Sequence, residues 1–401
     1  MSRSNAPSSK DRLAIFDEVW QTIRDRYYDA NLRDVNWDEQ RTIYRTHAAN
    51  AANTNAFYGV LRRMVGSLHD SHTRVYAPAE KFDWRNPRII STGVSIREIE
   101  NKFVVFSLEK DSAAVRAGVR AGDVVTSIDG IPAETVFAHK INEQTGISTA
   151  SATRLWAAAN ILEGAAGTIV RVGFQNAQGI EYTATLERNW RALSSGVRVK
   201  RAGAMLVIAF DTFTPELVGE FHGILGTHLQ HGVRGIVLDL RANRGGSTEA
   251  MIDIASAFLP ENKNIGKFID RTGKVAVEVR TRRGLMFTAR ATRVKNLPTV
   301  VLTSTATASA AEIFTAALKA ANQVKTVGAV TCGCVLAVKG QHALPDGGAL
   351  EISELDFQLP NGTRLEGIGV TPDEKISLIR KDILARHDLA LKRALEILRQ
   401  K

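Results

Sequence analysis

The sequence predicts an α/β core with a largely parallel sheet, preceded by a helical segment and interrupted by a β-rich insert. Residues 11–70 keep a helical apolar period, residues 88–190 hold short β-rich runs, and from about residue 196 strands and helices alternate. Such alternation is typical of βαβ units, whose strands run parallel in one sheet. We therefore predict a helical segment at 1–87, a β-rich domain at 88–190 and an α/β core at 191–401.

Size and composition exclude several classes of protein. A chain of 401 residues exceeds one ordinary core, and its 44% hydrophobic and 23% charged residues are typical of a globular protein. The net charge of +10 comes from scattered Lys and Arg without interleaved aromatics, so we expect no nucleic-acid partner. No apolar run approaches the roughly 20 residues of a membrane span. The polar first ten residues resemble no signal peptide, so we expect either a cytoplasmic chain or a periplasmic or secreted chain whose leader was trimmed.

The prediction of helices in the first segment depends on two stripes of apolar residues at helical spacing. The first includes Leu13, Phe16 and Val19, and the second runs through residues 57–68. The tetrapeptide Asp70-Ser71-His72-Thr73 follows the second stripe. Taken alone, His72 in such a loop would more often serve as a local cap than as a functional residue.

The β-rich domain contains apolar runs at 103–108, 124–128, 169–174 and 182–186 with turn signals between them. The run from Ala117 to Pro132, with Ala-Gly-Asp-Val-Val followed by Asp-Gly, resembles the most recognisable part of a PDZ domain. That resemblance implies a peptide-binding loop and strand at Thr92-Gly93-Val94, where an extended peptide adds as a further strand. The alternative is an ordinary small β-domain.

The α/β core shows two strand–loop–helix units. The first is a strand at 233–240, a tight loop at 241–246 and a helix at 247–259. The second is a strand at 299–303 and a helix at 310–320. The last helix, predicted at 379–400, is basic and amphipathic, which favours a packing element over a membrane anchor.

Ser309 opens the helix of the second unit, directly after a loop of small residues. The first backbone amides of a helix have no partner within it and carry the positive end of the helix dipole. A nucleophilic serine there would have half an oxyanion hole beside it, supplied by Ala310. Ser309 and Glu312 also spell a capping box, so the residue could serve only to begin the helix.

The two cysteines are Cys332 and Cys334. In an extended strand their side chains would share a face, but would lie too far apart for the ~3.8 Å Cβ separation that a disulfide prefers. A kink at Gly333 would bring them together. We expect unreacted, half-buried thiols.

Several segments together resemble peptidase family S41, the tail-specific or C-terminal processing proteases. They are Asp239–Gly246, Thr307–Ile313, Val327–Gly333, Leu344–Gly348 and Pro360–Asp373, together with the PDZ-like run and the N-terminal helices. The resemblance spans nearly the whole chain in the family's order. It implies a crotonase-like or ClpP-like core of βαβ units and a serine peptidase that needs no metal or cofactor.

One departure concerns the catalytic base. The processing-protease branch uses a lysine where this chain has Cys334, and Lys339 would point to the opposite face of a straight strand. The chain is more similar to the tricorn-core branch, which uses Ser–His–Glu. This resemblance implies His72 as base and Glu366 as its carboxylate, with Ser71 sharing the relay by bonding Glu366.

The resemblance implies that the second oxyanion amide comes from Gly245 or Gly246, beside that of Ala310. The expected activity is that of a serine endopeptidase acting on extended or C-terminal segments of a polypeptide substrate, with a homo-oligomer possible. A catalytically silent peptide- or ligand-binding protein on the same fold is the alternative, which Cys334 keeps open. An acyl-CoA enzyme of the crotonase type is a further rival, disfavoured by the PDZ-like insert.

Overall fold

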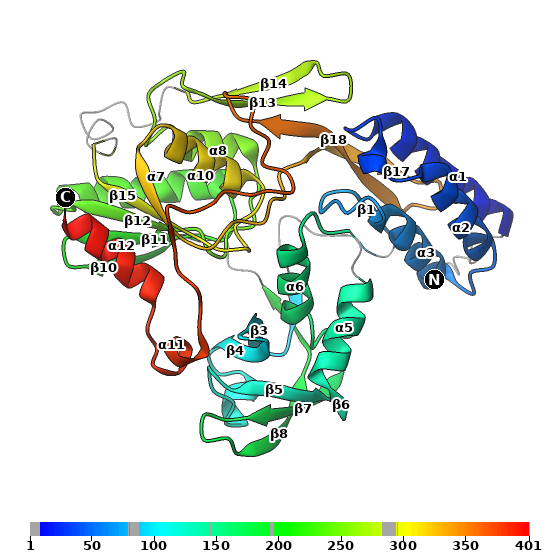
Figure 1. The fold of residues 1–401 in the computed structure, drawn as a ribbon, viewed down its shortest axis with the longest axis horizontal. Helices are drawn as coiled ribbons and strands as arrows, with labels where there is room; N and C mark the ends of the chain where they lie inside the picture. The colour runs from blue at the N-terminus through cyan, green and yellow to red at the C-terminus, as the bar shows by residue number, and fades with distance from the viewer. Residues whose placement is uncertain are drawn as a thin grey trace.

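The structure is a computed structural model that describes residues 9–78, 80, 88–143, 146–192, 196–282, 294 and 296–400. The N-terminal helices lie at one end of the molecule, the α/β core at the other, and the β-rich part below and between them (Figure 1). Residues 1–8 of the polar N-terminal stretch and the expected boundary at residue 87 lie outside the described residues.

The N-terminal part is helical, as the apolar stripes predict. Its elements are α1 (Ser9–Arg26), the 3-10 turn η1 (Leu32–Asp34), α2 (Trp37–Ala49), α3 (Thr54–Gly66) and the short strand β1 (Arg74–Tyr76). The side chain of Asn53 caps α3 by accepting the Ala56 N–H. The buried faces of α1 and α3 pack together with Leu344, Leu350 and Ile352 from the C-terminal half. The helices therefore share a core with a distant part of the chain.

The β-rich part has its own hydrophobic core, which includes Phe103, Val125 and Phe174. Its elements are β2 (Arg88–Ser91), β3 (Val94–Ile99), β4 (Lys102–Leu108), α4 (Ala113–Arg116), β5 (Val124–Ile128), β6 (Ile131–Pro132), α5 (Ala133–Glu143), α6 (Ala150–Ala159), β7 (Ile169–Gln175), β8 (Glu181–Glu187) and β9 (Asn189–Ala192). The strand order is β3-β4-β5-β7-β8, with β6 beside β5, so β3 lies at an edge. Strands β2 and β9, at the two ends of this part, pair with each other in a separate antiparallel sheet.

The α/β core is built on a sheet of order β10-β11-β12-β15-β16-β19. Its strands are β10 (Arg198–Ala202), β11 (Met205–Ala209), β12 (Gly235–Asp239), β15 (Thr299–Thr303), β16 (Val324–Gly328) and β19 (Glu374–Lys375). All neighbours run parallel except β10 with β11. The largely parallel sheet that the sequence predicts is thus confirmed.

Helices cover both faces of this sheet, which explains the continuous apolar run of β15. Val301 packs with α7 (Pro215–Gln230), α8 (Thr248–Ala255) and α10 (Ala310–Ala320). Val300 and Leu302 pack with α12 (Leu389–Arg399) on the other face. Successive side chains of a strand point to opposite faces, so a doubly covered strand is apolar throughout.

A second sheet joins the core to the N-terminal helices. It contains β13 (Asn264–Asp270), β14 (Val275–Arg280), β17 (Ala337–Ala343) and the long strand β18 (Ala349–Gln358). Strand β18 pairs with β13 near one end and with β1 near the other. The strand that directly follows His72 is therefore held by β18 (Figure 1).

The C-terminal helix predicted at 379–400 is in fact two helices, α11 (Arg380–Leu384) and α12. They are separated at Arg386, whose φ of 55° is incompatible with a continuing right-handed helix. Helix α12 packs its apolar face on the sheet, as expected of a packing element. No helix in the described part of the chain is long and apolar enough to cross a membrane.

Candidate active site

Ser309 lies at the turn from β15 into α10, with φ 55° and ψ −125°. A non-glycine residue rarely adopts this conformation, which costs of order 1–3 kcal/mol and persists only where the surroundings impose it. Ser309 and Glu312 form a capping box, in which the Ser309 N–H donates to the Glu312 carboxylate. A helix cap normally has an extended backbone, so capping alone does not explain the positive φ of Ser309, which is of the kind found at nucleophile turns.

Glu312 fixes the backbone around Ser309. Its side chain is fully buried and accepts the N–H groups of Ser309 (3.1 Å), Gly333 (2.7 Å) and Cys334 (2.9 Å) and the hydroxyl of Thr331. Burial raises the pKa of Glu312, and these four donors oppose that rise. One carboxylate thus ties the serine to the segment that follows β16.

The Gly-Gly loop packs directly against the serine. A Cβ on Gly245, whose φ is +94°, would lie 2.6 Å from the Ser309 Cβ and 3.0 Å from the Ala310 nitrogen, so this position requires glycine. The Gly245 N–H donates to the Asn243 side chain at 2.9 Å. Gly246, with φ +126°, lies against Phe213.

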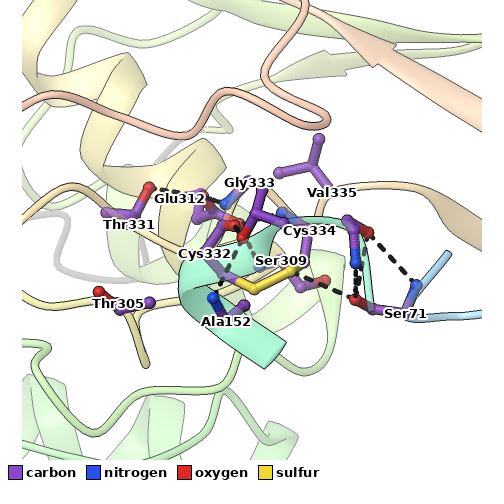
Figure 2. Close-up of a disulfide and its surroundings, with 12 residues drawn as sticks. Ser71, Ala152, Thr305, Ser309, Glu312, Thr331, Cys332, Gly333, Cys334 and Val335 are labelled. Atoms are coloured by element: carbon purple, nitrogen blue, oxygen red, sulfur yellow. Dashed lines mark hydrogen bonds between the residues drawn. A yellow bond between two sulfur atoms is a disulfide. The ribbon is translucent and has the colours of Figure 1, made fainter. Parts of the chain in front are cut away.

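Cys332 and Cys334 form a disulfide, which corrects the expectation of unreacted, half-buried thiols. The segment is not a straight strand, because Gly333 has a φ of +71° and the resulting kink brings the two Cα atoms to 5.2 Å. Both cysteines are buried, at 8% and 2% exposure. Figure 2 shows Ser309 and Ser71 both beside this disulfide.

His72 is surrounded by charged neighbours of the N-terminal part and β18. Its backbone N–H donates to Asp70 at 2.9 Å, and its ring lies in the field of Asp70, Arg74 and Glu351. Burial lowers the pKa of His72, which keeps the ring neutral near pH 7. The buried Nδ1 has no hydrogen-bond partner, and within the described ranges no hydrogen bond joins His72 to Ser309.

Ser71 points toward the disulfide. Its hydroxyl contacts the Cys334 Sγ at 3.4 Å and the Ser148 hydroxyl at 3.1 Å. It also accepts the Ser148 N–H at 3.1 Å. In the described part of the chain no hydrogen bond joins Ser71 to Glu366; Ser148, which bonds Ser71, instead lowers the pKa of Glu366.

Glu366 is a buried acid rather than a surface one, with 4% of its side chain exposed. It accepts the Val335 N–H at 2.8 Å and pairs with Arg33 at 3.3 Å. Burial raises the pKa of Glu366 to about 7, while Ser148, the Val335 amide and Arg33 hold it down. Its protonation state therefore changes near neutral pH.

The residues predicted to bind peptide lie at the start of β3. Thr92 is buried, the Gly93 N–H donates to the Ser91 hydroxyl at 2.9 Å, and Val94 pairs with Leu108 of β4. The free edge of β3 runs beside α6, and an ion pair between Glu98 and Arg154 spans the two elements. The loop amide of Gly93 is thus already satisfied locally.

A cleft of about 2070 Å³ separates the β-rich part from the core. Its walls include Arg97–Ile99 of β3, residues of α6, and the core segments Thr303–Thr305 and Gly328–Val330. These segments flank the nucleophile turn, although Ser309 itself does not line the cleft.

Sequence reasoning missed Ser148, Arg33 and the four hydrogen bonds that the buried Glu312 carboxylate accepts. Neither Ser148 nor Arg33 is part of a motif used above, so no local signal marks them. Glu312 was assigned to a capping box, and its isolated position in an apolar helix was the available clue to a buried carboxylate.

Comparison with known proteins gives matches to the same peptidase family that the sequence motifs resemble. Residues 204–376 match the model of "Peptidase family S41", and residues 8–66 match "Tricorn protease C1 domain". A "Probable CtpA-like serine protease" of Staphylococcus saprophyticus is 24% identical over 367 residues, covering 92% of this chain and 66% of the relative. The chain thus spans about two thirds of the length of that relative.

Solved structures with the same fold include two that match nearly end to end. The photosystem II D1 C-terminal processing protease has a TM-score of 0.60 and 22% identity, covering 91% of this chain and 93% of that one. Mature CPAF complexed with lactacystin has a TM-score of 0.72 and 13% identity, covering 98% and 97%. These likenesses confirm the α/β fold class predicted from the sequence.

Proposed function

We propose that this chain, whose residues 204–376 match the model of peptidase family S41, is a serine endopeptidase whose nucleophile is Ser309. One observation carries the proposal most directly. Ser309 has a strained backbone, with φ 55° and ψ −125°, at a strand-to-helix turn. Helix α10 begins with the next residue, Ala310, and in this proposal its amide donates to the tetrahedral oxyanion.

In this proposal His72 is the general base and Glu366 orients and supports its ring. A neutral imidazole is the form that accepts a proton from a serine hydroxyl, and the lowered pKa of His72 favours that form. Its unpartnered Nδ1 is free to bond a carboxylate. Catalysis then requires the ring to come within hydrogen-bond reach of Ser309, a bond that the described residues do not show.

The lysine-based alternative is disfavoured. Cys334 stands at the position of the lysine and is bonded to Cys332. Lys339 lies on β17, and its positive charge helps to lower the pKa of Asp270 on β13, in the second sheet. Neither residue offers an amine to Ser309.

We propose that the oxyanion is stabilised by the amide of Ala310 and by one of the Gly-Gly loop. Gly245 contacts Ser309, but its N–H already donates to Asn243, so its use requires that bond to break. The N–H of Gly246 has no hydrogen bond among the described residues, which favours it in the present arrangement.

The proposed substrate is an extended or C-terminal polypeptide segment that pairs with the free edge of β3. The cleft beside β3 leads toward segments that flank the nucleophile turn. Arg97 lines it and carries its positive charge near that of Arg244, which favours an anionic group such as a C-terminal carboxylate. The domain limits at 88–190 and 191–401 remain part of this proposal.

A catalytically silent binding protein is the second candidate, and the position of His72 away from a bond with Ser309 favours it. A fluorophosphonate probe separates the two, because it reacts with an activated serine. We expect labelling that is lost in Ser309→Ala and kept in Ser304→Ala, a nearby serine whose hydroxyl donates to the Arg241 carbonyl. Equal labelling of wild type and Ser309→Ala would overturn the assignment of the nucleophile.

A further inference from the structure

The disulfide lies between the nucleophile turn and the segment that carries His72. On one side, the Cys332 N–H donates to Thr307 at 2.9 Å and the Cys334 carbonyl accepts the Ser309 N–H at 2.9 Å. On the other side, the Ser71 hydroxyl lies 3.4 Å from the Cys334 Sγ (Figure 2). A covalent bond that breaks and forms with redox state therefore sits between two of the proposed catalytic elements.

The oxidised form coincides with a His72 ring that has no bond to Ser309. Ser71, the residue next to His72, is held toward the disulfide by Cys334 and by Ser148. The His72 ring lies instead with Asp70 and Glu351, and its Nδ1 has no partner. A buried, unpaired ring nitrogen is unfavourable, so this arrangement persists only because other contacts hold the segment in place.

We propose that Cys332–Cys334 is a redox modification site that holds the Ser71–His72 segment in a latent arrangement, and that reduction by a dithiol releases it. The inference rests on the proposed function, since it concerns the approach of His72 to Ser309. It adds a ligand class, a small dithiol or a dithiol protein, to a site at which the family resemblance implies no redox chemistry.

The chemical step is a two-electron thiol–disulfide exchange. A thiolate of the dithiol attacks the Sγ of Cys332. Cys332 is the more exposed of the two cysteines, with 8% of the residue exposed against 2% for Cys334. The bond between the two protein sulfurs breaks, and Cys334 leaves as a thiolate that the Ser71 hydroxyl stabilises before it takes a proton from water. The second thiol of the reductant then displaces Cys332 as a thiol, and the reductant ends as a disulfide.

Reduction changes the geometry because two thiol sulfurs cannot remain at bonding distance. Cys334 is anchored through its backbone N–H by Glu312 and through its carbonyl by Ser309, so its side chain is the part that turns. That movement takes away the sulfur contact of Ser71 and frees its neighbour, His72, to move toward Ser309.

The test uses the full chain with dithiothreitol as the dithiol. Cys332 and Cys334 are the two cysteines of the sequence, so any effect of the reductant arises at this bond, and intact mass verifies the redox state. We expect the rate of fluorophosphonate labelling at Ser309 to rise by about tenfold or more on reduction, within the range that a positioned base contributes. The double variant Cys332→Ser/Cys334→Ser should label at the rate of the reduced form with or without dithiothreitol.

A second readout does not depend on turnover. The imidazole NMR signal of His72, identified by its loss in His72→Gln, should titrate at a higher pH after reduction, because the ring leaves its buried position. Equal labelling rates and an unchanged His72 titration in both redox forms would overturn the inference while leaving the peptidase assignment intact. No labelling in either form of a folded chain would overturn both.

Discussion

Two regions differ in how many of their polar groups have hydrogen-bond partners. They are the corner around Ser309 and Glu312 (the serine corner) and the segment 70–74 around His72 (the histidine segment). In the serine corner, one buried carboxylate, Glu312, accepts four donors and fixes the backbone. In the histidine segment, Asp70 accepts the His72 N–H and the Thr73 hydroxyl, while the Nδ1 of His72 has no hydrogen-bond partner. The serine corner is built within the α/β core, whereas the histidine segment precedes β1, which packs on β18 and the N-terminal helices. A nucleophile within one rigid unit and a base from another allow activity to depend on how the two units align.

The largest effect is expected from removing the base. His72→Ala should lower peptide hydrolysis by a factor of ~10³ or more, because the Ser309 hydroxyl loses its proton acceptor. The matched control is His139→Ala, whose side chain is 71% exposed on α5 and should leave the rate unchanged. A His72→Ala protein that hydrolyses peptide at the wild-type rate would remove the histidine segment from the mechanism.

The next effect concerns Glu366. Glu366→Gln should lower kcat by about 10²-fold, because a neutral amide gives less support to a protonated imidazole. The wild-type rate should rise with pH through about 7, as Glu366 loses its proton, and this limb should vanish in the variant. A pH–rate profile of kcat/KM for both proteins checks this, and a retained limb in Glu366→Gln would assign it to another group.

The same substitution has a stability consequence of definite sign. The folded-state pKa of Glu366 is raised from 4.5 to about 7, so its contribution to stability is present at low pH and is lost as pH rises through about 7. The loss is at most roughly 3 kcal/mol. Glutamine does not ionise, so the Tm of Glu366→Gln should fall less between pH 5 and pH 8 than that of the wild type. A larger fall in the variant would contradict the raised pKa.

A smaller effect on rate is expected in the serine corner. Glu312→Gln keeps the side-chain volume but replaces one acceptor oxygen by an NH₂ group, which faces the donors that Glu312 accepts. At least one buried donor then loses its hydrogen bond, which lowers the free energy of unfolding by about 1–3 kcal/mol. We expect a lower Tm and about a tenfold slower reaction of Ser309 with a fluorophosphonate, since the backbone at the serine loosens. Glu216→Gln, in the exposed first turn of α7, is the control for the charge change. Unchanged labelling would show that β15 and α10 fix the serine without Glu312.

The smallest effect tests the bridge between the two regions. Ser148→Ala removes the hydroxyl between Ser71 and Glu366, and we expect a rate loss of about threefold, in keeping with one neutral hydrogen bond. Because Ser148 lowers the pKa of Glu366, the pH–rate midpoint should move upward. Ser151→Ala, exposed on α6, is the control. A midpoint that stays in place would show that Ser148 does not influence Glu366.

The sequence by itself determined the layered α/β core, the strand and helix on either side of Ser309, and the glycine at 245. These features follow from short-range rules, because apolar periodicity sets the elements and a tight turn at a helix start restricts the residue types. The bounds of β15 and α10 agree with the predicted ranges 299–303 and 310–320. The cysteine prediction failed because it assumed a straight strand, whereas Gly333 bends the chain.

The tertiary structure alone decided which distant groups share the site. Arg33, Ser148 and Glu366 come from three separate parts of the chain, and no periodicity or motif relates them. It also decided that Glu366 is buried and that the His72 ring lies with Asp70 and Glu351. Burial and charge pairing depend on how whole units pack, so they set the pKa values and the alignment of base and nucleophile, which local sequence does not encode.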